Sequence, residues 1–103
     1  MKRTKKLPAA SIARKLKSLP GWTHAHGTLH RQYTFVDFSE AFGFMARAAL
    51  AAEKMNHHPD WSNGYNKVKV DLSTHDAGGI TNLDFRLAEA MERLSSPPAS
   101  SPR

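Results

Sequence analysis

Residues 67–72 alternate strictly between charged and apolar side chains, and this alternation constrains the fold more than any other feature of the chain. Two valines and a leucine occupy every second position, and lysines and an aspartate lie between them. Successive side chains of a β-strand point to opposite faces, so this pattern predicts a strand with one buried face and one face in water. The chain must therefore place covering elements against one face of a sheet.

Other segments show helical spacing. Asp37 with Glu40, and Thr81 with Asp84, stand three residues apart as in a capping box and precede apolar residues at helical spacing. The predicted elements are a short helix around 12–19, strands over 22–26 and 29–35, a long helix from 37 to about 56, strands over 61–65 and 68–74, and a last helix over 83–94. The order α-β-β-α-β-β-α predicts an α+β fold, with an antiparallel sheet covered by helices on one face.

The size and composition indicate one small domain. The chain has 103 residues, 40% of them hydrophobic, which permits a modest core that self-association would help to bury. We expect a basic leader over 1–10, a single domain over 11–94 and a Pro/Ser-rich tail over 95–103, predicted to be disordered. The chain has no cysteine, which excludes disulfides and thiol chemistry, and no apolar run of membrane-spanning length.

The net charge of +6 is concentrated near the start of the chain. No acidic residue precedes Asp37, whereas eight lysines and arginines do. Such a segment could be a solvated leader, or it could bind nucleic acid, an acidic partner or an import receptor. It lacks the interleaved aromatic residues that stack on bases, so direct nucleic-acid binding is not expected.

A candidate acid/base site lies where the long helix is predicted to end. His57 and His58 precede Pro59, which disfavours helical geometry at His58, and His75 follows a predicted strand. Histidine exchanges protons near neutral pH without large tuning, so three imidazoles in one pocket could move several protons. The simpler alternative is exposed histidines, two of them at a helix end where the dipole favours cations.

Several neighbours have both a structural and a functional interpretation. Asp84 could orient an imidazole or serve only as a helix cap, and Glu53, one helical turn before His57, could hold its tautomer or remain solvated. Trp61 could form a flat wall for a bicyclic ring or fill the core.

A metal site is a further alternative. His24 and His26 would share one strand face, and the three later histidines could add ligands, although no spaced carboxylate or thiolate supports this. The motifs of nucleotide-binding loops, serine hydrolases and zincins are also missing, which leaves proton transfer without a cofactor.

The histidines also carry a family resemblance. Glu53, His57-His58-Pro59, Tyr65, His75 and Asp84 resemble the signature of the pterin-4a-carbinolamine dehydratases in type and spacing. Segments 41–45, 52–54, 65–68 and 72–75 resemble the animal members, and the resemblance runs from about residue 21 to residue 94. It implies a four-stranded antiparallel sheet and assembly as a dimer or tetramer.

The resemblance also implies an activity, that of a hydro-lyase which removes water from a 4a-hydroxytetrahydropterin and yields the quinonoid dihydropterin. This reaction recycles the pterin of an aromatic amino acid hydroxylase. By position, His57, His58 and His75 are the implied catalytic imidazoles, with His58 as the acid beside the leaving hydroxyl and the base left open between the other two.

Further residues take roles by the same resemblance. The implied substrate contacts are those three histidines with Asn56, Trp61, Ser73 and Thr74, and the implied supporting residues are Glu53, which would support His57, and Asp84. No metal or separate cofactor is implied, and some animal members carry an acidic residue where this chain has Asn56.

The family implies a second class of function. Some members act as dimerisation cofactors of a homeodomain transcription factor, which makes a non-enzymatic interaction module the alternative. We expect a cytoplasmic protein, with a nuclear location also open.

Overall fold

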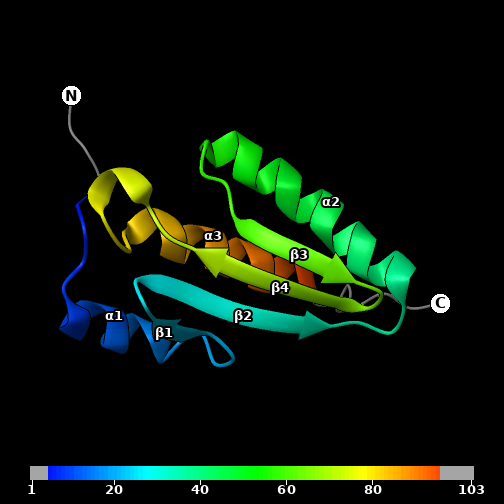
Figure 1. The fold of residues 1–103 in the computed structure, drawn as a ribbon, viewed down its shortest axis with the longest axis horizontal. Coiled ribbons are helices and arrows are strands. Elements are labelled where there is room, and N and C mark those ends of the chain that lie inside the picture. Colours follow the sequence, from blue (N-terminus) through cyan, green and yellow to red (C-terminus); the bar gives the residue numbers. More distant parts are fainter. Residues whose placement is uncertain (1–4, 96–103) are drawn as a thin grey trace.

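The computed structural model describes residues 5–95, which form a sheet layer packed against helices (Figure 1). The predicted element order is confirmed, and the bounds are α1 (Ala9–Leu16), β1 (Thr23–Ala25), β2 (Thr28–Thr34), α2 (Phe38–Met55), β3 (Asp60–Gly64), β4 (Lys67–Leu72), a short 3-10 helix η1 (His75–Ala77) and α3 (Asn82–Ser95). The chain is already folded before residue 11, since α1 begins at Ala9 and the Leu7 N–H donates to the Ile80 carbonyl at 2.8 Å. Most of the predicted tail lies outside the described residues.

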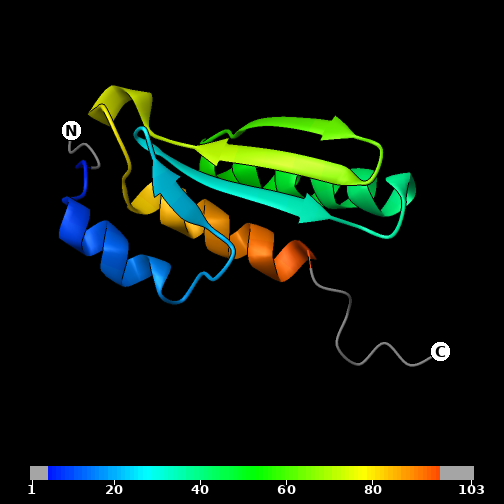
Figure 2. The ribbon, with the colours of Figure 1, turned by 60° about the horizontal axis from the view of Figure 1, so that its bottom comes forward.

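The four strands form one antiparallel sheet in the order β1-β2-β4-β3. Helices α2 and α3 cover one face of it, as predicted, and the other face is open (Figures 1 and 2). The alternation over 67–72 has the expected effect, because Val68, Val70 and Leu72 are buried while Lys67 and Lys69 are exposed.

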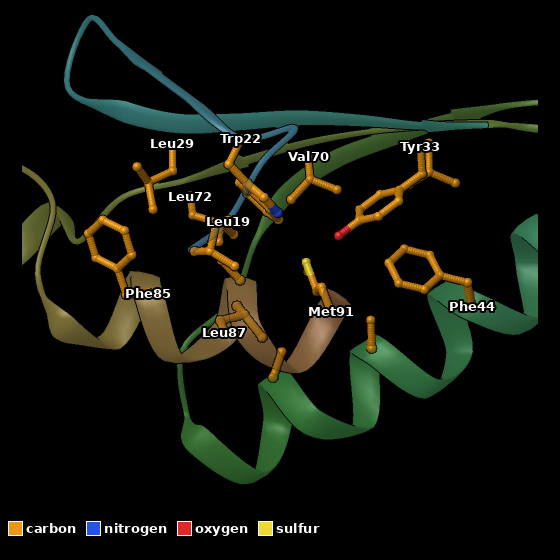
Figure 3. Packing of buried hydrophobic residues seen from close by; sticks show 14 of the residues in the cluster. Leu19, Trp22, Leu29, Tyr33, Phe44, Val70, Leu72, Phe85, Leu87 and Met91 are labelled. Atoms are coloured by element: carbon orange, nitrogen blue, oxygen red, sulfur yellow. The ribbon is translucent and has the colours of Figure 1, made fainter. Parts of the chain in front are cut away.

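The core fills the space between the covered sheet face and the two helices. Figure 3 shows Leu29, Val70 and Leu72 of the strands facing Leu87 and Met91 of α3. At one end of this layer the rings of Tyr33 and Phe44 pack with centroids 4.8 Å apart. Burial of these side chains fixes α2 and α3 against the sheet, and so fixes the segments that leave the C-terminal end of α2 and enter α3.

The two long helices begin as the sequence predicts. The Asp37 side chain accepts a hydrogen bond from the Glu40 N–H at 2.8 Å, and Thr81 and Asp84 form the predicted cap of α3. The hairpin turns differ by one residue from the prediction, because His26 and Tyr65 adopt left-handed backbone conformations and close the turns earlier. His26 therefore lies in a turn and does not share a strand face with His24.

Within residues 5–95 no helix has both the length and the apolar character needed to cross a membrane.

Candidate active site

The C-terminal end of α2 directs the two adjacent histidines to different environments. Asn56 ends the helix in the left-handed conformation (φ 53°), which asparagine tolerates better than most residues, and the His57 N–H returns to the Ala52 carbonyl at 3.0 Å. Pro59 then keeps the chain extended into β3. As a result His57 points inward and is 8% exposed, whereas His58 points to solvent.

His57 is held by a buried carboxylate. Its Nε2 lies 2.6 Å from Oδ1 of Asp84, a residue that is fully buried in the first turn of α3. The other oxygen of Asp84 accepts hydrogen bonds from the Thr81 N–H at 2.9 Å and the Thr74 hydroxyl at 2.8 Å. Asp84 therefore has both of the roles that the sequence left open, because it caps α3 and orients an imidazole.

This arrangement sets the tautomer of His57. An ionised carboxylate only accepts hydrogen bonds, so Nε2 of the imidazole carries the proton that lies against Asp84. In the neutral ring Nδ1 is then left as an acceptor. Because His57 also lines the pocket described below, it can offer an unprotonated nitrogen there.

His58 has a different partner from the one that its neighbour has. Its Nε2 lies 2.9 Å from Oε1 of Glu53, and both side chains are more than half exposed. The sequence interpretation assigned Glu53 to His57, whereas the structure pairs it with His58. Solvent screens such a pair, so Glu53 restrains the His58 ring weakly compared with the buried contact to His57.

The third histidine reaches the site from the end of β4. After Leu72 the chain continues through Ser73 and Thr74 into η1, whose first residue is His75, and an isolated bridge between Thr74 and Gly79 closes this loop. The Thr74 hydroxyl also bonds to that of Thr81 at 2.8 Å, so the loop is tied to the start of α3. These contacts bring the two histidine-bearing segments together.

The two segments form the walls of a shallow pocket of about 230 Å³ that is open to solvent. Its lining residues are Asn56, His57, His58, Ser73, Thr74, His75 and Asp76. Six of these seven residues were proposed from the sequence. Asp76 was missed, although its place next to His75 is a signal that could have indicated it.

Two residues of the sequence pattern lie elsewhere. Trp61 pairs with Val70 across β3 and β4, and its half-buried side chain packs against the core, outside the residues that line the pocket. Tyr65 lies in the turn between these strands and is exposed. In the described part of the chain no three His, Asp or Glu side chains gather closely enough to hold a metal ion, which gives the metal alternative no ligand set there.

Fold and site together define an α+β protein with an open pocket in which a buried carboxylate orients one of three histidines. The family model described as Pterin 4 alpha carbinolamine dehydratase matches residues 5–94. The chain belongs to this family.

Relatives and solved structures agree with this assignment. A protein of Solibacter usitatus (strain Ellin6076), named provisionally as a pterin-4-alpha-carbinolamine dehydratase, is 53% identical over 93 residues, which cover 90% of this chain and 98% of the relative. A protein of Nitrobacter winogradskyi with the same provisional name is 57% identical over 82 residues, which cover 78% of this chain and 81% of the relative.

Two solved structures are also similar. One is described as a transcriptional coactivator/pterin dehydratase from Brucella melitensis, with a TM-score of 0.87 and 42% identity over 89% of this chain and 100% of that chain. The other is a pterin dehydratase-like protein identified as a RuBisCO assembly factor in the alpha-carboxysome. It has a TM-score of 0.61 and 17% identity over 75% of this chain and 89% of that chain, so this likeness concerns the fold alone.

Proposed function

We propose that this chain dehydrates 4a-hydroxytetrahydropterin to quinonoid dihydropterin. The observation that carries the proposal is the convergence of three histidines on one open pocket, one of them oriented by the buried carboxylate of Asp84. Family membership supplies the substrate class.

The proposed reaction needs one acid and one base. The bond between the bridgehead carbon and its hydroxyl oxygen breaks as the acid gives the oxygen a proton, and water leaves. The base removes the proton from the adjacent ring nitrogen, and that electron pair forms the new carbon–nitrogen double bond. Positioned acids and bases of this kind contribute about 10²- to 10⁴-fold each.

The contacts in the pocket favour particular roles. His57 is the proposed base, because its Nε2 faces Asp84 and its Nδ1 is left to accept a proton. His58 is the proposed acid, since its side chain is exposed, lines the pocket and is held through Nε2 by Glu53. His75 reaches the pocket from the segment that follows β4 and is the third proposed catalytic imidazole. Ser73 and Asn56 are proposed substrate contacts.

The proposal extends to the setting of the reaction. It requires no cofactor, because the pterin is the substrate, and it links the chain to an aromatic amino acid hydroxylase that produces this substrate. A cytoplasmic location, with access to the nucleus, belongs to the same proposal.

The test follows the decay of enzymatically generated 4a-hydroxytetrahydropterin by absorbance, at matched concentrations of folded protein. Wild type should accelerate the decay, and His57→Ala, His58→Ala and His75→Ala should each lose most of that acceleration. His30→Ala is the matched control, because His30 is also bonded to an aspartate, Asp71, but lies on the open sheet face. A folded wild type that leaves the uncatalysed decay unchanged would overturn the proposal.

One observation favours a second role as an interaction module. Phe38, Phe42 and Leu50 of α2 are exposed although they are large and apolar, and Val36 lies exposed just before the helix. Exposed apolar groups of this kind mark protein interfaces. The simplest partner for this surface is another copy of the chain, in a dimer or tetramer, and a transcription factor is the alternative. Light scattering tests self-association directly, and Phe42→Asp should have a lower molecular mass in solution than wild type.

A further inference from the structure

A second concave site lies between α2 and α3, away from the histidine pocket. It is a groove of about 280 Å³, a volume close to the lower end of the range for small-molecule sites. Its lining residues are Ala51, Lys54, Met55, Arg86, Glu89, Ala90 and Arg93. None of these residues lines the histidine pocket, so the groove is a separate feature of the surface.

The groove carries an excess of positive charge. Lys54 comes from α2, and Arg86 and Arg93 come from α3, where two helical turns place them about 10 Å apart along the axis. The ion pairs formed among residues 5–95 involve none of these three cations. Glu89 offsets one of the three, which leaves two positive charges without a partner in the described part of the chain.

The base of the groove is apolar. Ala51 and Ala90 are small enough to leave room for a ligand, and Met55 is a flexible, polarisable side chain that adapts to the shape of a ligand. A site of this composition combines hydrophobic contact with a few charged groups that fix orientation, which is the usual character of small-molecule sites. An inorganic ion would use the cations but not this apolar surface.

We infer that this groove binds an organic phosphate monoester, with its phosphate on the arginines and its organic part on the apolar base. A phosphate monoester carries a charge of about −1.5 to −2 at pH 7, which matches the excess in the groove. The guanidinium fork of arginine suits bidentate contact with phosphate oxygens, and a lysine adds a point charge. The inference does not depend on the proposed dehydratase activity.

The test uses phenyl phosphate as the probe and backbone amide chemical shifts of the full chain as the readout. Saturable shifts should appear at Ala51, Met55 and Ala90 and should weaken as salt rises, because exposed charges are screened. Inorganic phosphate should bind more weakly, since it lacks the apolar part. Benzoate has an aromatic ring but only one negative charge, so it tests whether the phosphate group is required. Benzoate binding as tight as that of phenyl phosphate would contradict a phosphate monoester site.

Substitutions then locate the binding. The double variant Arg86→Gln/Arg93→Gln should weaken the probe about tenfold, because each exposed contact contributes up to about fivefold. Arg14→Gln, which removes an exposed arginine from α1, is the matched control and should bind like wild type. Lys54→Gln provides a second variant on the other helix, with a smaller loss expected.

Three further results would overturn the inference. They are shifts confined to the histidine pocket, equal affinity in the double variant and wild type, and a change in oligomeric mass that accounts for all groove shifts.

Discussion

Asp84→Asn is the substitution that tests the site most sharply, because the new side chain has nearly the same shape. The carboxylate is fully buried and accepts three hydrogen bonds, from His57, Thr74 and Thr81. A hydrogen bond to a charged group contributes about 1.5–3 kcal/mol and a neutral one about 0.5–1.5 kcal/mol, so removing the charge costs about 1 kcal/mol per bond. Across the three bonds the free energy of unfolding should fall by about 3 kcal/mol.

The same substitution should change the protonation pattern of His57. The asparagine oxygen is best placed toward the two donors of Thr74 and Thr81, which turns its NH₂ toward His57 Nε2. That nitrogen must then accept a hydrogen bond, so the ring proton moves to Nδ1 and the base in the pocket is lost. We expect the dehydration rate to fall by about 10²-fold or more, the usual contribution of a positioned base.

Asp71→Asn is the matched control. Asp71 also bonds a histidine, with 2.9 Å between its Oδ1 and Nδ1 of His30, but both side chains are more than 40% exposed. An exposed pair contributes at most about 1 kcal/mol, and this one lies outside the pocket lining. Urea unfolding and dehydration kinetics measure both variants, and similar small effects for the two aspartates would refute the reasoning.

Three further predictions concern groups around the site and core. Glu53→Gln should change the free energy of unfolding by less than about 0.5 kcal/mol, because its contact with His58 is exposed, and should slow dehydration less than Asp84→Asn does; a larger loss in urea unfolding would contradict this. Burial raises the pKa of Tyr33, so its phenol ionises first in the unfolded chain. The free energy of unfolding of wild type should therefore fall as pH rises above about 10, and that of Tyr33→Phe should fall less. Urea unfolding from about pH 8 to 11 measures both, and equal losses in the two proteins would contradict this prediction. Gly21→Ala should destabilise by about 2 kcal/mol, because Gly21 has φ 101°, which alanine rarely adopts, and an added Cβ would lie 2.2 Å from the Arg31 guanidinium; an unchanged midpoint in urea would contradict both the backbone and the steric cost.

The parts of the fold that follow local rules could be predicted from sequence. The alternation over 67–72 placed one face of β4 in the core, and the cap pairs located the starts of α2 and α3. Each of these rules depends on residues within a few positions, which the sequence displays directly. The pocket residues could also be predicted from sequence, because the end of α2 and the end of β4 both carry histidines.

Contacts beyond an element's end could not be predicted in the same way. The sequence interpretation paired Glu53 with His57 by helical spacing, but the left-handed conformation of Asn56 ends that spacing and turns His57 toward Asp84. Glu53 then meets His58 instead. The location of Trp61 depends on the register between β3 and β4, which local sequence does not reveal. Its pairing with Val70 places it on the covered face of the sheet and so outside the pocket.

The groove between α2 and α3 depends on tertiary packing. Lys54 lies more than 30 positions before Arg93, and only the packing of the two helices makes them walls of one groove. No local pattern in the sequence indicates this proximity.

The most direct test of the account is a titration of ring-labelled histidines with 7,8-dihydrobiopterin, a stable pterin of the product's oxidation level. The chain has six histidines, three of which line the pocket while His24, His26 and His30 do not. The account predicts that the ring resonances of His57, His58 and His75 shift saturably while the other three stay unchanged. Saturable binding that leaves the three pocket histidines unshifted would contradict the account.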